Sequence, residues 1–281
     1  MAARYSPTVR KRILGIELRK IRERRGLTGQ RASAEIDISP GMLSSIETAK
    51  RNVTKAQLMA LLDVYRIDNS DPVRSQLLLL HQTSRQPAWW QGMGVPAGSY
   101  VDLEAEAQEI RSYDALMVPG LLQTERYAEE IILATSDGLT DDEIAQRVKV
   151  RRQRAALLDQ GLKLWTIIDE AALRRIVGCV EIMREELGYL ADRIDALPNL
   201  TVQVLRFADG AHQGLDGGFA LLYFEDHPPL GCTERGEVQT WLEKGYEVDS
   251  ARLRWDHVLS VASSERNSAS YIRSVARELQ G

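Results

Sequence analysis

The feature that most limits the fold of this chain is a pair of short helical segments near the N-terminus, joined by a turn of about three residues. Thr28 can cap the first segment and Ser39 the second, with Pro40 at its first helical position, where a missing N–H costs nothing. The small Ala32 and Ser33 allow the two helices to cross closely. This spacing predicts a helix-turn-helix motif.

Hydrophobic periodicity predicts further helices on both sides of this pair. Leu14, Leu18 and Ile21 fall on one stripe of a helix that Gly26 ends. Other anchors and caps have clear positions: Leu43 and Ile46 in the third helix, Thr54 before the fourth, and Asp71-Pro72 before the fifth. We therefore expect an all-α domain of five helices over residues 1–86.

Charge is unevenly distributed along the chain. Residues 1–86 hold 16 Lys and Arg against 8 Asp and Glu, a net charge of +8. The whole chain carries −4, so residues 87–281 carry −12. The basic N-terminal part is suited to binding a polyanion, whereas the acidic remainder is not. An alternative reading is a solvated helical surface that is merely basic.

Residues 12–67 resemble the xenobiotic-response-element type of helix-turn-helix domain, in the Cro and phage-repressor superfamily. The resemblance is carried by Leu18-Arg19, Arg22-Glu23, Gly26-Leu27-Thr28, residues 36–40 and residues 43–47. It implies that the third helix lies in the major groove of DNA. The sequence departs from the family pattern at Gly29, where Gln is frequent, and at Ala49, where Gly is frequent.

Transferred position by position, the resemblance implies three sets of DNA contacts. Base-facing residues are Pro40, Gly41, Met42 and Ser45. Backbone contacts are Thr28, Gln30, Arg31, Ser39, Ser44, Lys50, Arg51 and Asn52. A basic N-terminal arm for the minor groove comprises Arg4, Arg10, Lys11 and Arg12. Because the base-facing set lacks Arg, Asn and Gln, specificity depends on van der Waals contact, water or DNA shape.

Residues 87–100 are rich in Gly and Pro, which predicts a linker between residues 1–86 and a second domain over 101–281. Trp89 and Trp90 are expected to pack one domain on the other. The second domain mixes predicted elements. Strands are expected at 110–118, 162–168 and a pair at 200–207 and 218–224, and helices at 123–135, 140–159, 181–196, 246–262 and 264–280. Elements out of βαβ order indicate an α+β domain.

This second domain resembles the C-terminal domain of actinobacterial regulators of the WhiJ-like group. The resemblance is carried by residues 103–107, 118–124, 151–154, 169–174 and 210–219, among others. It implies kinship without a mechanism, because the activity of that domain is not established. Members of the group are commonly paired with a small acidic protein in an antitoxin-like arrangement, which implies a protein partner.

Chemistry-bearing residues in the second domain give little sign of catalysis. The four histidines lack metal-ligand spacing, and Cys179 and Cys232 form neither a disulfide framework nor a zinc site. We therefore predict no enzyme activity, cofactor or metal. Glu170, His212 and Asp216 are candidates for a ligand site. The cations between Arg147 and Arg154 are expected to form an exposed helix face paired with acids, and residues 210–218 a hairpin loop.

These observations predict a cytoplasmic, sequence-specific DNA-binding transcriptional regulator, dimeric on a near-palindromic operator. No secretory signal and no membrane-spanning run is present in the pattern. Two alternatives stay open. One is an antitoxin-like protein that mainly neutralises a small acidic partner, and the other is a small-molecule sensor.

Overall fold

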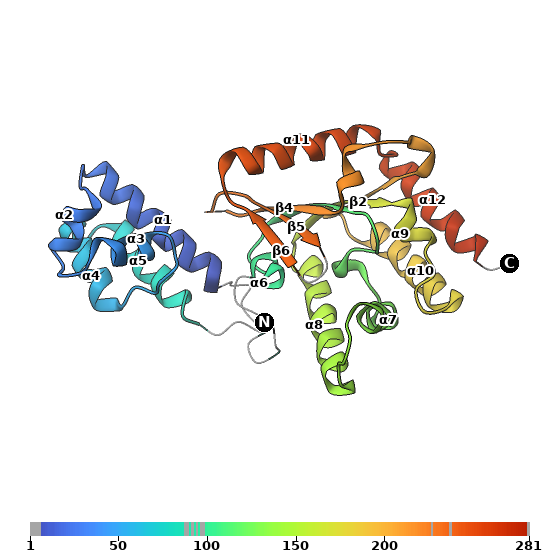
Figure 1. Cartoon of the computed structure of the whole chain (residues 1–281), viewed down its shortest axis with the longest axis horizontal. Helices are drawn as coiled ribbons and strands as arrows, with labels where there is room; N and C mark the ends of the chain where they lie inside the picture. Colours follow the sequence, from blue (N-terminus) through green and yellow to red (C-terminus); the bar gives the residue numbers. More distant parts are fainter. Residues whose placement is uncertain are drawn as a thin grey trace. The chain divides into compact units, whose positions relative to one another are not determined.

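The computed structural model describes residues 7–86, 90, 93, 95, 99–225, 227–235 and 238–279. The chain divides into two compact units, Met1–Glu106, called the head below, and Ala107–Gly281, called the body. Figure 1 shows helices in the head and a helix-flanked sheet in the body. The predicted order, a helical N-terminal region followed by a mixed α and β domain, is confirmed.

Within its described residues, the head contains the five predicted helices and one more. They are α1 (Pro7–Arg24), α2 (Gly29–Ala34), α3 (Pro40–Glu47), α4 (Lys55–Val64), α5 (Pro72–Thr83) and α6 (Tyr100–Glu104). The side chains of Thr28, Ser39, Thr54 and Asp71 each accept a backbone N–H at a helix start. The predicted N-caps are therefore confirmed, because capping depends on residues close in sequence.

One cluster of apolar side chains forms the core of the helix-turn-helix region. Leu14, Leu18 and Ile21 of α1 pack there with Leu43 and Ile46 of α3. Leucines of α4 and α5 complete the cluster. All five helices thus share one core, which fixes α3 against its neighbours.

The second unit begins later than the sequence suggested. Residues 100–106 group with the head, where Leu103 and Ala105 are fully buried. Glu106 forms an ion pair of 2.5 Å with Arg10 of α1. Trp90 is buried, whereas Trp89 lies outside the described residues.

The body is built on a six-stranded sheet in the order β3-β2-β1-β4-β5-β6. The strands are β1 (Glu109–Asp114), β2 (Lys163–Asp169), β3 (Leu200–Leu205), β4 (Phe219–Tyr223), β5 (Leu230–Arg235) and β6 (Val238–Leu242). Strands β1, β2 and β3 are parallel, β4 pairs antiparallel with β1, and the pairs β4–β5 and β5–β6 are also antiparallel. The parallel half contains helical crossovers, as parallel neighbours require.

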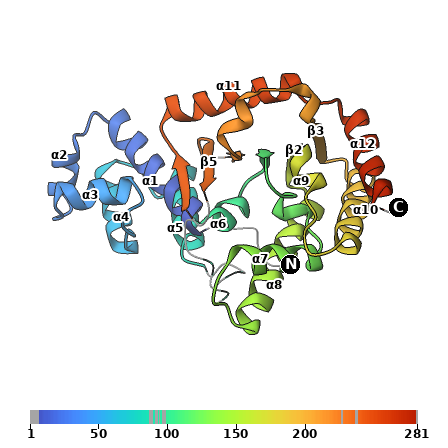
Figure 2. The same cartoon turned by 45° about the vertical axis from the view of Figure 1, so that its right-hand side comes forward.

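Helices cover both faces of this sheet. They are η1 (Gly120–Leu122), α7 (Glu125–Thr135), α8 (Asp141–Asp159), α9 (Glu170–Arg174), α10 (Val180–Ala196), η2 (Phe207–Asp209), η3 (Gln213–Asp216), α11 (Gly245–Val261) and α12 (Glu265–Glu278). In Figures 1 and 2, α11 lies along one side of the sheet, and α7 and α8 lie on the other. Trp255 of α11 packs in a buried cluster with Tyr113, Ile167 and Leu221.

The predicted pairing of strands 200–207 and 218–224 is wrong. Strand β4 pairs with β1 and β5, so β2 and β1 lie between it and β3. Residues 206–218 therefore form no hairpin loop. They contain η2 and η3 and connect two strands that are not neighbours. The strand expected at 110–118 ends at Asp114, and β5 and β6 were not predicted.

The described residues contain neither a membrane-spanning helix nor a group of metal-ligating side chains. None of their helices is both long and apolar enough to cross a membrane. No group of three or more His, Cys, Asp or Glu side chains among them is placed to hold a metal ion.

Candidate nucleic-acid interface

Helix α3 is fixed at its start and along one side. The Ser39 hydroxyl accepts the Met42 N–H at 3.1 Å, and Pro40 occupies the first helical position. Leu43, Ile46 and Glu47 are buried against the head. The remaining surface of α3 is therefore held in one orientation by the core.

The exposed face of α3 differs in detail from the predicted base-facing set. Pro40, Gly41, Ser44 and Thr48 are exposed, which places Ser44 and Thr48 on the outer face. Ser45 is half-buried and donates to the Gly41 carbonyl at 2.8 Å. An added Cβ on Gly41 would meet no heavy atom within 4 Å, so open space lies beside the first turn of α3.

Met42 does not project freely from α3, and its expected base contact stays a prediction. Its side chain is half-buried and packs against the core cluster of the head. The Gln57 amide also donates to its Sδ at 3.7 Å. A long apolar side chain next to Leu43 and Ile46 gains more from this burial than from exposure to water.

Helix α2 crosses α3 through small residues, as predicted. Ala32 and Ser33 are buried with exposed fractions of at most 1%. Thr28 accepts the Arg31 N–H at 3.2 Å and leaves Gln30 and Arg31 exposed. The side chains expected to contact the DNA backbone thus lie at the exposed start of α2.

The loop after α3 turns sharply and carries exposed polar side chains. Ala49 adopts a φ of 56°, the left-handed conformation that glycine favours. Lys50, Arg51 and Asn52 follow it and are exposed, and Val53 anchors the loop in the core. Their position beside α3 suits the predicted contact with a phosphate backbone.

The predicted N-terminal arm is not an extended segment over residues 10–12. Arg10, Lys11 and Arg12 lie in α1, which begins at Pro7. Val9 and Ile13, one helical turn apart, are buried and hold this part of the chain as helix. Arg10 is engaged with Glu106. Arg4 lies outside the described residues.

A buried ion pair connects α1 to α3, and the sequence patterns did not indicate it. Arg22 donates from Nε to Glu47 Oε1 at 2.6 Å and from Nη2 to Oε2 at 2.9 Å, and its Nη1 donates to the Leu27 carbonyl. The hydrogen bond with Glu47 raises the pKa of Arg22. This bidentate contact fixes the end of α3 relative to α1.

Gly15 is a second positioning residue that sequence reasoning missed. A Cβ added there would lie 2.6 Å from the Glu47 carbonyl oxygen and 2.8 Å from that of Ile46. Only a glycine lets α1 approach the end of α3 so closely. A glycine inside a helical pattern, far from either end, is the sequence signal for such a contact.

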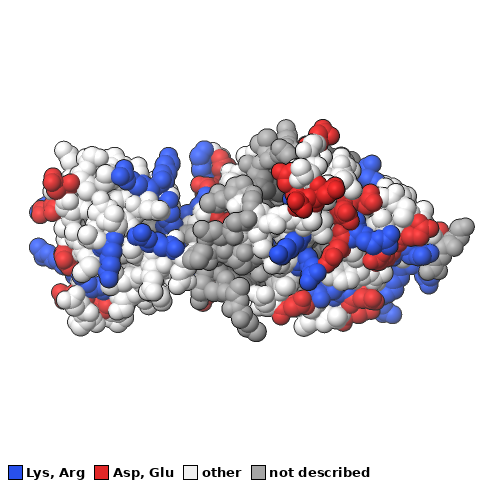
Figure 3. All heavy atoms as spheres, turned by 90° about the horizontal axis from the view of Figure 1, so that it is seen from below, with Lys and Arg blue, Asp and Glu red and all other residues white. Residues whose placement is uncertain are grey.

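The acidic residues of the head neutralise only some of its cations. Glu17 pairs with Lys20, Glu23 with Arg19, Glu47 with Arg22, and Asp63 with Arg74. Within the described residues, Arg31, Lys50 and Arg51 have no ion pair or side-chain hydrogen bond. On the face of the head in Figure 3, Lys and Arg side chains gather on one part, and acidic ones lie mainly at another edge.

The three ligand candidates in the body have different surroundings within the described residues. Glu170 is buried and accepts hydrogen bonds from Tyr271, Arg174 and the Phe207 N–H. Burial raises the pKa of Glu170, but these three hydrogen bonds outweigh it and lower the pKa overall. Its oxygens are therefore already occupied by the protein.

His212 and Asp216 lie in and beside η3. His212 Nδ1 accepts the Gly214 N–H at 3.1 Å, and its ring packs edge-on against Tyr113. Its Nε2 lies 3.8 Å from Asp169 Oδ2, beyond hydrogen-bond distance. Asp216 is exposed. This arrangement favours a packing role for His212 over ligand binding.

Comparison with known proteins agrees with the two units. Residues 13–76 match a family described as a helix-turn-helix domain, so the head belongs to the class defined by that motif. Residues 97–274 match the family described as a domain of unknown function (DUF5753). The chain belongs to this DUF5753 family. Neither description names an enzyme activity, and no curated protein matches the chain.

Proposed function

We propose that this protein is a sequence-specific DNA-binding transcriptional regulator of the Cro and phage-repressor type, acting in the cytoplasm. The observation that carries the proposal is the exposed face of α3, which is held by a buried core and flanked by cations that have no acidic partner among the described residues. Pro40, Gly41 and Ser44 face the major groove in this proposal, while Arg31 and Lys50 contact phosphates.

The short side chains of α3 determine how it reads sequence. Pro40, Gly41, Ser44 and Thr48 carry no amide or guanidinium group for a bidentate base contact. They allow the helix backbone to come close to the base edges. Discrimination then comes from hydroxyl contacts, bridging water and DNA shape.

Tight operator binding by such a head calls for two copies. A single module of this size buries about 600–1,000 Å² on DNA. We propose a homodimer on a near-palindrome, with half-sites one helical turn, ~34–36 Å, apart. The body supplies dimerisation or partner binding, and its net charge of −9, from 20 Lys and Arg against 29 Asp and Glu, keeps it away from DNA.

A second candidate function follows from the same basic surface. A face with cations that lack acidic partners also suits a small acidic protein, which then competes with DNA. The acidic body is a poor surface for such a partner because like charges repel. In this antitoxin-like alternative the head, rather than the body, holds the partner.

Fluorescence anisotropy with a labelled duplex from the region upstream of its own coding sequence tests the proposal. The wild-type protein should bind in the presence of excess unrelated DNA. Gly41→Glu places a carboxylate on the outer face of α3 in open space and should weaken binding more than tenfold. Gly188→Glu makes the same change in open space on α10 of the body and should bind like wild type. Absence of a competitor-resistant complex at low salt would contradict the proposal.

A further inference from the structure

A small pocket in the head lies where α1, the loop after α3 and the end of α5 meet. Its walls are formed by buried or apolar groups of all three segments: Leu14, Gly15, Ile46, Val53 and His81. Its polar lining is Lys11 from α1, Arg51 and Asn52 from the loop, and Ser84 and Arg85 after α5. Three cations thus surround one hollow without any acidic residue in its lining.

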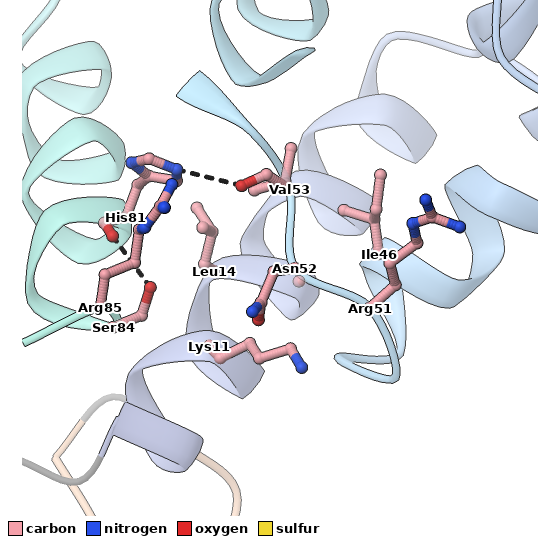
Figure 4. Close-up of a pocket in the computed structure, with 10 residues that line it drawn as sticks. Lys11, Leu14, Ile46, Arg51, Asn52, Val53, His81, Ser84 and Arg85 are labelled. Carbon is pink, nitrogen blue, oxygen red and sulfur yellow. Dashed lines mark hydrogen bonds between the residues drawn. The ribbon is translucent and has the colours of Figure 1, made fainter. Parts of the chain in front are cut away.

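Figure 4 shows how these side chains lie. Asn52 points toward the stem of the Lys11 side chain, Arg51 extends away on one side, and Arg85 runs beside His81 on the other. The cations therefore form a row and do not converge on one point. His81 Nε2 lies 3.0 Å from the Val53 carbonyl oxygen, and this contact holds the loop to α5.

The cations of this row lack partners within the protein. Among the described residues, Lys11, Arg51 and Arg85 have no ion pair and no side-chain hydrogen bond. Burial lowers the pKa of Lys11, because its ammonium group loses hydrating water and no acidic side chain compensates for that loss. Lys20 on the same helix instead pairs with Glu17 at 2.7 Å. An external anion would supply the missing countercharge.

The size of the hollow limits what that anion is. Its volume of about 10 Å³ is close to the space that one water needs. A small-molecule effector does not fit. A single oxygen on a larger chain outside the pocket does fit, and a phosphodiester backbone presents such oxygens at regular intervals.

We propose that Lys11, Asn52, Arg51 and Arg85 form a phosphate track that follows one strand of the DNA backbone. Lys11 and Asn52 hold one phosphate oxygen between them, while Arg51 and Arg85 contact the phosphates on either side. The inference rests on the proposed function and extends it to the start of α1 and the end of α5. It also replaces the predicted minor-groove role of Lys11.

Salt dependence of DNA binding tests the track in the full-length protein. Each lost phosphate contact lowers the slope of log K against log salt concentration by ~0.9. Lys11→Gln and Arg85→Gln should each show this fall. The affinity loss between 50 and 200 mM salt would then be smaller by roughly threefold for each variant. Unchanged melting temperatures confirm that the variants are folded.

Lys20→Gln is the matched control. Lys20 lies nine residues from Lys11 on α1, two and a half turns away and therefore on the opposite side of the helix. It is already neutralised by Glu17, so its slope should equal that of wild type. Equal falls in Lys11→Gln and Lys20→Gln, or no fall in either pocket variant, would overturn the track.

Two further experiments distinguish a failure of the phosphate track from a failure of the proposed function. Replacing single phosphates of the bound duplex by neutral methylphosphonates should reveal one position that weakens wild type but leaves Lys11→Gln unaffected. The lack of any such position counts against the track alone. If wild type binds no duplex, the proposed function fails. In that case the melting temperature is measured with and without inorganic phosphate. A rise in wild type that is lost in Lys11→Gln supports an anion site at Lys11, and the absence of a rise in wild type overturns that site.

Discussion

The head and the body both carry cations in dense groups, but they use them differently. Helix α8 of the body has five cations between positions 147 and 154. Arg152 pairs with Glu125 at 2.9 Å, Arg151 donates to Gln123, and Arg147 donates to the Ser136 hydroxyl at 2.9 Å. In the head, Arg31, Lys50 and Arg51 have no such partners among the described residues. The two units therefore differ in whether their cations are paired within the protein, and not in how densely the cations are grouped.

The two units also differ in how they bury ionisable groups. The head buries Arg22 together with Glu47, and each neutralises the other. The body buries Glu186, which accepts the Thr124 N–H at 2.8 Å, and no cation among the described residues is in contact with it. A buried ion pair keeps its two side chains in contact over a wide pH range, whereas the protonation of a solitary buried carboxyl changes with pH.

Breaking the buried pair of the head should have the largest effect. Glu47→Ala leaves Arg22 buried without its countercharge, which should lower the free energy of unfolding of the head by about 3–5 kcal/mol. Urea unfolding followed by circular dichroism measures this. Glu17→Ala removes the partner of Lys20 at the surface, does not touch Arg22, and should leave stability almost unchanged. Equal effects of the two variants would show that the buried pair does not hold α3.

The solitary carboxyl of the body should give the next largest effect. Burial raises the pKa of Glu186 to about 7 from 4.5. The unfolded chain releases this proton near pH 4.5 and the folded chain near pH 7. The stability that the group contributes is therefore present below pH 4.5 and lost as pH rises through 7.

Glu186→Gln should remove that pH dependence. Relative to wild type, the variant should gain about 3 kcal/mol in the free energy of unfolding on going from pH 4.5 to pH 8. Urea unfolding at the two pH values measures the difference. The Gln side chain can still accept the Thr124 N–H. If the free energy of unfolding of wild type changes with pH in the same way as that of the variant, the prediction is wrong.

The loss of an unpaired cation of the head should weaken DNA binding more than the loss of a paired cation of the body. Arg51→Ala should weaken binding to all DNA sequences alike and lower the salt slope by about one unit. Arg152→Ala in the body should leave both quantities unchanged, although its surroundings are richer in cations. Anisotropy titrations at several salt concentrations compare the two. A body variant that weakens binding as much would place DNA on α8.

Base preference should respond to smaller changes on α3. Ser44→Ala removes a hydroxyl from the exposed face and should alter preference at one base pair by about 1 kcal/mol. Ser45→Ala should have a smaller effect, because the Ser45 hydroxyl already donates to Gly41. Selection from a randomised duplex pool measures both. The reverse order would restore Ser45 to the predicted base-facing set.

The smallest expected effect concerns the backbone after α3. Ala49 pays for its left-handed conformation, which glycine adopts without a Cβ clash. Ala49→Gly should therefore stabilise the head by about 1 kcal/mol. Its thermal unfolding should shift upward while DNA affinity stays the same. A lower melting temperature would mean that the Cβ of Ala49 contributes packing that outweighs the strain.

Much of the head could be predicted from the sequence because its determinants are local. Caps such as Ser39 act within one turn, and the stripe of Leu14, Leu18 and Ile21 needs only helical periodicity. The contacts between Arg22 and Glu47, and between Gly15 and α3, join distant positions. No local pattern specifies them.

Strand order in the body was harder to predict for the same reason. Strands β3 and β4 follow one another in sequence, but β4 adds to β1 on the far side of the parallel half. Strand β5 includes Gly231, Cys232 and charged residues, so it lacks the alternation that indicates a strand. The position of Met42 likewise depended on which side chain fills the core beside α3.

Photocross-linking from α3 tests the central claim most directly. A benzophenone amino acid replaces Ser44 on the exposed face of α3 in one variant and Arg152 of the body in another, and each is irradiated with the labelled upstream duplex. A DNA cross-link from position 44 alone, removed by excess unlabelled duplex, is the predicted result. No cross-link from position 44, or equal cross-linking from both positions, would contradict the assignment of α3 to the major groove.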